Sequence, residues 1–422
     1  MGYRLYNRAL QITAPLARFY LGFSKHKALL QRFAPDVPTF RSAPLWIHAC
    51  SVGEVQVTRP LIQALREHFP DVPLVLSAAT ASGKRLAQQI FPDLAVVWCP
   101  FDTVSAVRVF LDAATPRALL LVETELWPNL IRETRSRGIP TVIVNGRISE
   151  KHFARYLRLP KLFREVLRHV DLCCVQEPVY RDRFIALGME PTRVVVAGNM
   201  KYDAVATTVP SEVQQRLRRM FGLTGREPVL VVGSSRPGDE SLLRDAWRLL
   251  REEVPGLRLI LVPRHVERAA EILALFDEPV SLRSQATEAN PCSSHVILVD
   301  TVGELVPIYS LAAVAVVGGS FFPGVEGHNP LEPAGLGVAT VFGPYMKNFA
   351  EPAKALCESG GAVQCEAESL LGTLRGLFSD EALRREMGKR AQTYILERQG
   401  SVARHLQQVS TVFTDRYPAA GQ

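Results

Sequence analysis

Short apolar segments alternate with amphipathic segments along most of this chain. In the first half, the segments that we predict to be strands are residues 45–49, 72–78, 118–122, 141–144, 172–175 and 194–197. Segments with helical periodicity, such as 54–68, separate them. Strands that alternate with helices favour a parallel, doubly wound α/β sheet.

The alternation breaks near residues 204–228 and then begins again. In the second half, the predicted strands are residues 229–232, 257–262, 296–299, 314–317 and 339–342. We interpret the break as an interdomain linker. The sequence therefore predicts two Rossmann-like domains, each a doubly wound parallel sheet, facing a cleft. The predicted boundaries are an N-terminal helical segment 1–40, a first domain 41–205, a linker 206–225, a second domain 226–395 and a C-terminal helix 396–422 that returns toward the first domain.

The N-terminal segment has a pattern of its own. Residues 9–23 are mostly apolar but contain Pro15 and Arg18, and they fall short of the ~20 residues that a membrane span needs. No small-residue cleavage site follows, so a signal peptide is not expected. Basic residues flank the segment: Arg4, Arg8, Lys25, His26, Lys27 and Arg32. This pattern is typical of a helix that lies in a membrane interface; a helix packed on the first domain is the alternative.

Composition supports a globular protein with two cores. The chain has 422 residues, 47% of them hydrophobic, and a formal net charge of +7, which favours anionic partners. Its seven cysteines are scattered and contain no Cys-x-x-Cys pair. Neither a disulfide framework nor a zinc site is indicated, and a reducing compartment fits best.

Polar residues follow the predicted strands, and ligands of open α/β sheets bind beyond the carboxyl ends of strands. In the first domain these residues are Ser51, Gly53, Glu54, Glu123, Glu125, Arg147 and Lys201. In the second domain they are Arg236, Pro263, Arg264, Val302, Gly303 and Glu304. Carboxylates thus gather in the first domain and cations and helix starts in the second. This asymmetry suits an acceptor hydroxyl that is activated on one side and an anionic donor that is held on the other.

The segment Gly318–Ala334 is the most informative single motif. A buried strand leads into Gly318 and Gly319, and Pro330 opens a helical pattern with Asn329 as its N-cap. Strands that lead through a Gly-rich turn into a helix bind nucleotides or phosphates. Asn329 and Glu332 could then bind hydroxyl groups of a ribose or a base. An ordinary Gly-rich turn is the alternative.

The sequence lacks the residues that several other chemistries need. Gly233 and Gly238 resemble half a P-loop, but Asp239 and Glu240 stand where Lys and Ser/Thr are needed. No Gly-x-Gly-x-x-Gly follows the first strand, and the sequence has no Asp-x-Asp, no metal-ligand spacing and no Gly-x-Ser-x-Gly. A transferase that uses neither metal nor cofactor remains.

Five blocks in one order resemble the 3-deoxy-D-manno-octulosonic acid (Kdo) transferase family of GT-B glycosyltransferases. The blocks, which together span about residues 45–350, are Trp46-Ile-His-Ala-Cys-Ser51-Val-Gly-Glu54, Glu123-Thr-Glu-Leu-Trp-Pro-Asn129, Gly198-Asn-Met-Lys201-Tyr-Asp203, Val262-Pro-Arg264-His265 and Gly327-His-Asn-Pro-Leu-Glu332. The resemblance implies transfer of Kdo from CMP-Kdo to lipid IVA, the tetraacyl-disaccharide lipid A precursor, in lipopolysaccharide core biosynthesis. It also implies a peripheral protein on the cytoplasmic face of the bacterial inner membrane, with the acceptor bound by the first domain and the donor by the second.

The resemblance assigns roles to individual residues. Glu54 matches the general base of an inverting transferase, and Glu123 and Lys201 match positions used around the transition state. From the residues alone, a Glu in a first helical turn is also common for its favourable dipole interaction, and Lys201 could be a surface lysine. Ser51, Gly53, Glu125, Arg147 and Arg236 are candidates for the acceptor side or the cleft. Glu125 either orients the acceptor or pairs with Arg147.

On the donor side, the resemblance assigns CMP binding to two loops and to one helix start. These residues are Pro263, Arg264, Val302, Gly303, Glu304, Asn329, Pro330, Leu331 and Glu332. Family members often carry Met at the position of Val302, Gly at that of Glu326 and His at that of Arg236. The last departure leaves the role of Arg236 open.

Residues 151–168 carry six cations against one acid, Glu165, with apolar residues between them. This segment could bind an anionic membrane surface or phosphates of the acceptor; an amphipathic core helix with a solvated basic face is the alternative. Nucleic-acid binding is not expected, because no recognition motif accompanies the charge. Two other functions stay open: a GT-B enzyme with another nucleotide sugar, and a non-catalytic lipid-binding relative.

Overall fold

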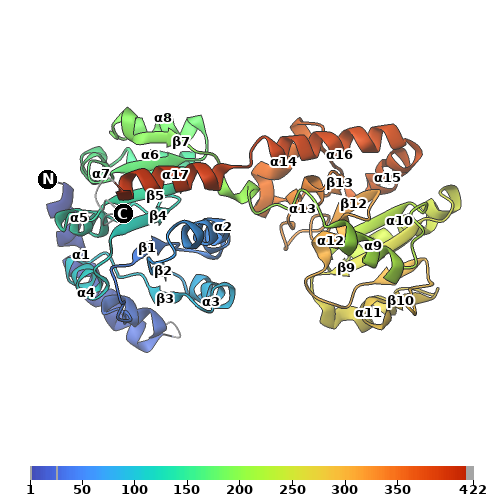
Figure 1. The fold of residues 1–422 in the computed structure, drawn as a ribbon, viewed down its shortest axis with the longest axis horizontal. Helices are drawn as coiled ribbons and strands as arrows, with labels where there is room; N and C mark the ends of the chain where they lie inside the picture. Colours follow the sequence, from blue (N-terminus) through green and yellow to red (C-terminus); the bar gives the residue numbers. More distant parts are fainter. Residues whose placement is uncertain (1, 25–26, 415–422) are drawn as a thin grey trace. The chain divides into compact units, whose positions relative to one another are not determined.

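The computed structural model describes residues 2–24 and 27–414, which form two compact units (Figure 1). Unit 1 combines the chain up to Ala204 with the chain from Arg398 onward, and unit 2 is Val205–Glu397. Of the predicted features, Lys25, His26 and the end of the C-terminal segment, 415–422, lie outside the described residues.

Unit 1 is built on one parallel sheet, which has seven strands within the described residues and the order β3-β2-β1-β4-β5-β6-β7. The strands are β1 (Leu45–His48), β2 (Leu74–Ala78), β3 (Ala95–Trp98), β4 (Ala118–Val122), β5 (Thr141–Gly146), β6 (Leu172–Val175) and β7 (Val194–Val196). Alternate residues of a strand face opposite sides of the sheet. Accordingly Trp46 joins one buried cluster while Leu45 and Ile47 join the other.

Helices cover both faces of this sheet (Figure 1). One face is covered by α2 (Val52–His68), α3 (Ala81–Ile90) and α17 (Ser401–Thr414). The other is covered by α4 (Val104–Ala114), α5 (Pro128–Ser136), α7 (Pro160–Leu167) and α8 (Pro178–Ala186). Helix α17 reaches unit 1 after the whole of unit 2 has been traversed, and its Val402, Val409 and Phe413 are buried in the core beside α2.

Unit 2 repeats the architecture. Its parallel sheet has seven strands among the described residues, in the order β10-β11-β9-β8-β12-β13-β14. The strands are β8 (Val229–Ser235), β9 (Arg258–Pro263), β10 (Val280–Leu282), β11 (Val296–Leu298), β12 (Val314–Val317), β13 (Ala339–Phe342) and β14 (Ala362–Gln364). The helices of the unit are α9 (Ser211–Met220), α10 (Asp239–Glu253), α11 (Ala269–Leu273), α12 (Leu305–Tyr309), α13 (Leu331–Gly335), α14 (Ala350–Glu358), α15 (Leu370–Ser379) and α16 (Glu381–Leu396). Two parallel α/β sheets confirm the predicted fold class.

The predicted linker 206–225 is wrong. This segment contains α9, and Leu217, Met220 and Phe221 are buried in the core of unit 2. The charged residues that made the segment look like a linker, such as Arg216 and Arg219, lie on the outer side of an amphipathic helix. The polarity of one face therefore concealed the apolar stripe of the other.

The N-terminal segment is helix α1 (Gly2–Phe23), followed by a 3₁₀ helix, η1 (Lys27–Phe33). Tyr3 is buried in the core of unit 1, and its hydroxyl donates to the carbonyl oxygen of Pro128. Further along α1, large apolar side chains remain in solvent: Leu5, Ile12, Leu16, Phe19, Tyr20 and Phe23 are each at least 64% exposed. The helix thus buries residues near both of its ends, Tyr3 and Leu21, and leaves an apolar face uncovered. No helix of the described ranges combines the length and apolarity that crossing a bilayer demands.

The basic segment 151–168 forms two helices rather than one. Helix α6 (Glu150–Tyr156) ends before Pro160, which opens α7. A proline disfavours helical geometry in the residue before it. Leu159 accordingly has backbone angles outside the helical region (φ −126°, ψ 54°). Between the helices, Leu157 and Leu159 are 46% and 51% exposed.

Candidate active site

In each sheet, early strands are added on one side of the first strand and later strands on the other. This topological switch point lies between β1 and β4 in unit 1 and between β8 and β12 in unit 2. Loops diverge beyond the carboxyl ends of such strands and leave room for a ligand. The segments that follow β1 and β4 carry Ser51 and Glu54, which lies in the first turn of α2, and Glu123 and Glu125. The loops after β8 and β12 carry Arg236 and the segment that begins at Gly318. The predicted candidates of each unit thus include residues at its switch point.

Glu54 lies in the first turn of α2 and is only 8% exposed. Its two carboxylate oxygens accept hydrogen bonds from the backbone N–H of Cys50 (2.7 Å) and from the Ser51 hydroxyl (2.7 Å). Burial and the neighbouring charge of Glu125 raise its pKa to about 7, although these hydrogen bonds act in the opposite direction. A carboxyl group with a pKa near neutrality can both accept and hold a proton at physiological pH.

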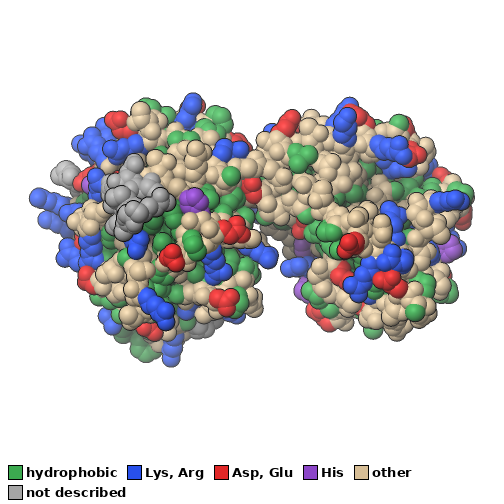
Figure 2. Space-filling model, viewed as in Figure 1, with side chains coloured by type: hydrophobic (Ala, Val, Ile, Leu, Met, Phe, Trp, Pro, Cys, Tyr) green, Lys and Arg blue, Asp and Glu red, His purple; other side chains and the backbone are tan. Residues whose placement is uncertain are grey.

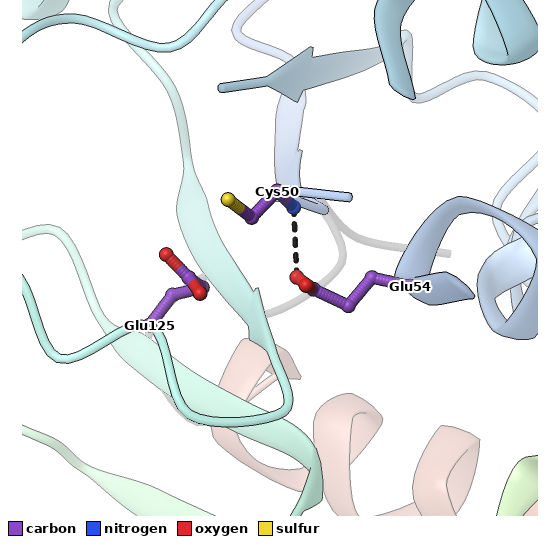
Figure 3. Close-up of side chains that lie close together, drawn as sticks. All are labelled: Cys50, Glu54 and Glu125. Atoms are coloured by element: carbon purple, nitrogen blue, oxygen red, sulfur yellow. Dashed lines mark hydrogen bonds between the residues drawn. The ribbon is translucent and has the colours of Figure 1, made fainter. Parts of the chain in front are cut away.

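Glu125 comes from the loop after β4, and its carboxylate points toward the Glu54 and Cys50 side chains (Figure 3). The Trp127 indole N–H donates to its Oε2 at 2.6 Å, and the Nε2 atom of His48 lies 3.8 Å from the same oxygen. Burial alone would raise the pKa of Glu125, but interactions with His48 and Trp127 outweigh it and the pKa is lowered. The two carboxyl groups are therefore shifted in opposite directions, which is typical of an acid–base pair.

Pairing with Arg147, one of the two alternatives left open for Glu125, is not the ion pair that the structure shows. Arg147 instead approaches Glu123, with 4.0 Å between its Nε and the Glu123 Oε2. Glu123 has a left-handed backbone (φ +60°), and non-glycine residues in this region are uncommon and concentrate at functional sites. The turn directs Glu123 and Glu125 to different partners, a separation that their spacing in the sequence did not reveal.

These side chains line a cavity of about 380 Å³ in unit 1. Its lining residues are Glu54, Glu123, Thr124, Glu125, Leu126, Trp127, Arg147, Ser149, His152, Arg155 and Tyr156. Glu54, Glu123, Glu125 and Arg147 are thus brought together from the segments that follow three strands, β1, β4 and β5. Ser51 contributes through its hydrogen bond to Glu54. Gly53, in the first turn of α2, is exposed.

Lys201 lies in the short 3₁₀ helix η3 (Met200–Tyr202) and is not part of the lining of this cavity within the described residues. Asn199 caps η3 by accepting a hydrogen bond from the Lys201 N–H (3.0 Å). The Asn145 side chain accepts another from the Met200 N–H (3.0 Å). The backbone at Lys201 is therefore held by Asn145 at the end of β5 and by Asn199 in the loop that follows β7.

In unit 2, Ser234 near the end of β8 has left-handed geometry (φ +56°), and Arg236 lies in the loop that follows the strand. Asp239 is buried and joins this loop to the next: its Oδ2 accepts from the N–H groups of Arg236 (2.9 Å) and Gly319 (2.6 Å). Burial raises the pKa of Asp239 to about 6, against the effect of these bonds. Gly318 cannot carry a side chain, since a Cβ there would stand 2.6 Å from the carbonyl oxygen of Ser234.

Several cations of unit 2 gather near His328. Burial first, and then the charges of Arg264, Arg236 and His265, lower the pKa of His328 to about 4. The Nε atom of Arg236 is buried and lacks a hydrogen-bond partner among the described residues. An electropositive region of this kind suits an anionic ligand such as a phosphate.

The helix predicted to open at Pro330 begins one residue later. Pro330 is the N-cap of α13, and Asn329 accepts from the N–H of Leu331 (3.1 Å) while its amide donates to Glu332 (3.2 Å). Burial raises the pKa of Glu332, opposed by Asn329 and Arg264. The short α13 places the amide and the carboxylate side by side.

The other predicted donor-side residues lie on two neighbouring loops. Pro263 ends β9 and is buried, whereas Arg264 is exposed and its N–H donates to the carbonyl oxygen of Ser235 (3.1 Å). Val302 is 82% exposed, Gly303 is left-handed (φ +92°) and Glu304 is the N-cap of α12. The Glu304 carboxylate accepts hydrogen bonds from Arg283 (2.7 Å) and from the Thr301 hydroxyl. This side chain therefore stabilises its own loop.

Cys50, Glu54 and Glu125 could together hold a small cation, because one ligand atom of each lies within 4.8 Å of the others. Both oxygens of Glu54 already accept hydrogen bonds. Burial, followed by the charges of Glu125 and Glu54, raises the pKa of the Cys50 thiol, which favours its neutral form. We therefore describe these residues as a carboxyl pair beside a thiol and assign no metal to them.

Sequence reasoning missed three buried polar groups. In the sequence, His48 stands out only as part of a motif, and Asp239 and Glu240 stand out only as residues that a P-loop would not have. All three are at most 1% exposed. A histidine at the end of an apolar strand, and two acids in the first turn of an apolar-faced helix, were the available signals. Their partners, Glu125, Gly319 and Arg268, are too distant in the sequence to be inferred.

Comparisons with known proteins identify the relatives of this chain. Residues 22–204 match the family model described as 3-deoxy-D-manno-octulosonic-acid transferase (kdotransferase). The chain is 31% identical to the 3-deoxy-D-manno-octulosonic acid transferase of Bordetella pertussis, over 96% of this chain and 98% of that protein. It is 28% identical to the Haemophilus influenzae protein of the same name, over 95% and 96%.

Among solved structures, Acinetobacter baumannii MurG is similar in fold, with a TM-score of 0.52 and 15% identity over 83% of this chain and 94% of that one. The architecture is that of the GT-B glycosyltransferases. With a relative above 30% identity along nearly its whole length, this chain belongs to the 3-deoxy-D-manno-octulosonic acid (Kdo) transferase family.

Proposed function

We propose that this enzyme transfers Kdo from CMP-Kdo to lipid IVA with inversion at the anomeric carbon, and that Glu54 is the general base. The observation that carries the proposal is a carboxyl group of pKa about 7 beside an ionised one, at a cavity of about 380 Å³. Such a base typically contributes ~10²–10⁴ in rate.

The proposed reaction moves one proton to Glu54 and one electron pair to the departing CMP. Glu54 removes the proton of an acceptor sugar hydroxyl, and the oxygen forms a bond to the anomeric carbon of Kdo. The bond from that carbon to the CMP phosphate breaks, and its electron pair leaves with CMP. Attack opposite the leaving group inverts the configuration. Lys201 and Glu123 act around the transition state, where electrostatic stabilisation is worth the most.

Unit 2 supplies suitable chemistry for the donor. Arg264 and Arg236 can neutralise a phosphate as CMP leaves, and a guanidinium can do so with two parallel hydrogen bonds. The Asn329 amide and the Glu332 carboxylate lie together at the start of α13 and can bind ribose or base hydroxyls. Because these groups are provided by the chain itself, the proposed reaction uses no metal and no cofactor.

The acceptor is a lipid, and unit 1 has a surface that fits one. Helix α1 leaves its apolar side chains exposed and packs by its first residues on α7. Lys and Arg side chains gather around α7 at the edge of unit 1 (Figure 2). Exposed Leu157 and Leu159 stand among exposed cations, including Arg155, Arg158 and Lys161. We propose that this surface holds the protein at the cytoplasmic face of the inner membrane, by apolar insertion and attraction to anionic lipid.

The test is turnover of the purified protein with freshly prepared CMP-Kdo and lipid IVA in the presence of EDTA, with products measured by mass spectrometry. A mass increase of one or more Kdo units supports the proposal and counts the residues transferred. Product with a UDP-sugar instead would favour a GT-B enzyme of different donor specificity. Lipid binding without any product would favour a non-catalytic relative.

A further inference from the structure

His48 is the last residue of β1 and its side chain is fully buried. Its Nδ1 atom lies 3.1 Å from the carbonyl oxygen of Ser77 and 3.0 Å from the Ser77 hydroxyl. A carbonyl oxygen can only accept, so a hydrogen on Nδ1 makes this contact a hydrogen bond. The Trp46 indole N–H donates to the Ser77 hydroxyl at 2.7 Å, which holds the hydroxyl in place. One side of the ring is therefore fixed.

The other ring nitrogen is directed at the acid pair. Nε2 has no hydrogen-bond partner among the described residues; Oε2 of Glu125 lies 3.8 Å from it, and the Cys99 thiol also acts on the ring. The same oxygen accepts from the Trp127 N–H, as an ionised carboxylate would. An unprotonated Nε2 would turn its lone pair toward that carboxylate in a site shielded from water, where such repulsion is costly. A proton on Nε2 turns the contact into an ion pair.

We propose that His48 is a positioning residue of the transfer reaction, a buried imidazolium that keeps Glu125 ionised and in place opposite Glu54. This inference deepens the proposed function and rests on it, because it assumes that Glu54 is the base. His48 itself is enclosed beneath the loops and acts only through Glu125 and through its charge.

The surrounding charges agree with this assignment. The titratable groups that act on the ring or are acted on by it are Cys99, Glu125 and Glu54. Cys50 and Arg32 interact with these groups in turn. Burial lowers the pKa of His48, but Cys99 and Glu125 outweigh it, and the pKa lies well above its ordinary value. Arg32, held by the carbonyl oxygens of Cys99 and Ala79, adds one further positive charge nearby. Glu123, Arg147 and Arg155 belong to the more open cavity.

His48 and Glu125 should act on Glu54 with opposite sign. The charge of Glu125 raises the pKa of Glu54, and the charge of His48 lowers it. Removing either charge must therefore displace the protonation of the base, but in opposite directions. A residue that only filled space would lower activity without this displacement.

The first experiment is the pH dependence of kcat/KM for wild type, His48→Gln, Glu125→Gln and the double variant, with His68→Gln as the control. His68 is an exposed histidine near the end of α2. In His48→Gln we expect the acidic limb to move up by roughly one pH unit, and in Glu125→Gln to move down by a similar amount. The double variant should return toward wild type, and His68→Gln should not shift. An acidic limb that stays in place in His48→Gln but moves in Glu125→Gln would overturn the proposal.

A second measurement does not depend on activity or on any His48 variant folding. In ¹⁵N-histidine-labelled full-length protein, one ring should keep both nitrogens protonated at pH 8, and in Glu125→Gln that ring should lose a proton at lower pH. Absence of such a ring would overturn the inference whatever the enzyme transfers. If the ring is present but the limbs do not move, Glu54 is not the base, and it is the proposed mechanism that fails.

Discussion

The Nε2 atom of His405 accepts a hydrogen bond of 2.9 Å from the backbone N–H of Asn145. The two residues are 260 positions apart in the sequence. His405 lies on α17, its Nδ1 donates to the carbonyl oxygen of Ser401 (2.7 Å), and the ring is therefore a neutral tautomer of fixed orientation. Asn145 has a left-handed backbone (φ +54°) and in turn accepts from Met200, next to Lys201. The C-terminal helix is thus linked to the loop that carries a proposed catalytic residue.

Replacing His405 with alanine should destabilise unit 1 by about 2 to 4 kcal/mol, because it leaves the Asn145 N–H buried without a partner and creates a cavity. The measurement is urea unfolding followed by a probe in unit 1, such as Trp46 fluorescence. Gln407→Ala, at an exposed position of the same helix, is the control and should change stability little. Equal stability of both variants would contradict the role assigned to this hydrogen bond.

The same histidine gives a pH dependence of known sign. Burial lowers the pKa of His405 to about 4, below its ordinary value of about 6.5. Between these values the unfolded chain binds a proton that the folded chain does not, so stability falls as the pH decreases. From pH 7.5 to pH 5 the loss from this residue should be about 2 kcal/mol.

Replacement by glutamine, which does not titrate, should remove this component. The free-energy difference between wild type and His405→Gln should therefore shift by about that amount over the same interval. An unchanged difference between pH 7.5 and pH 5 would show that the ring is not held neutral.

Glu54→Gln should abolish most turnover, by ~10²–10⁴, while making the protein more stable at alkaline pH. The folded pKa of about 7 lies above the ordinary value of 4.5, so the stability of wild type is full below pH 4.5 and is lost as the pH rises through 7. At pH 8 the variant should be more stable by on the order of 1 to 3 kcal/mol, and this advantage should vanish as the pH falls below 4.5. Glu67→Gln, at an exposed site on the same helix, should alter neither quantity. A variant that retained full turnover would exclude Glu54 as the base.

Arg264→Ala should raise the KM for CMP-Kdo by about 10- to 100-fold, because a charge-assisted bond to phosphate is lost. Calorimetric titration with CMP should show a matching loss of affinity. The control is Arg385→Ala, whose guanidinium is exposed on α16 and pairs with Glu381 within the same helix. If CMP binds both variants equally, the phosphate is held elsewhere.

The double substitution Leu16→Glu and Phe19→Glu should weaken binding to vesicles that contain anionic phospholipid by at least about 10-fold, since it puts charge on the exposed apolar face of α1. Leu383→Glu changes an exposed leucine of unit 2 and should bind like wild type. Cosedimentation measures both. Folding can be checked by CMP affinity, which should be the same in all three proteins. Unchanged vesicle binding of the double variant would mean that α1 is not the membrane contact.

Sequence patterns predicted the central strands better than the edges. The strands that were missed, β3, β10 and β14, each stand at the edge of a sheet. Edge strands are short and only partly buried, as Val280–Leu282 shows, so they lack the continuous apolar run that marks a central parallel strand. A central strand can be recognised from its own apolar residues, whereas the burial of an edge strand depends on the elements that pack beside it.

The candidate site shows the same limit. Strand-end position was sufficient to select Glu54, Glu123, Glu125 and Arg147, which line one cavity. The pairing within the set was not predictable, because the left-handed turn at Glu123 decides which carboxylate meets Arg147. His48 was missed for a related reason: its importance comes from Ser77 and Glu125, which two other strands bring to it.

Because α17 completes the core of unit 1, the ribosome makes the first 204 residues long before it makes the helix that covers them. All of unit 2, Val205–Glu397, must be translated in between, which takes roughly ten to forty seconds at ~5–20 residues per second. During this interval the apolar residues of α2 that later meet Val409 and Phe413 are open to solvent or to a chaperone. A nascent chain stalled before Ser401 should therefore aggregate or recruit a chaperone even though its second unit can already be folded.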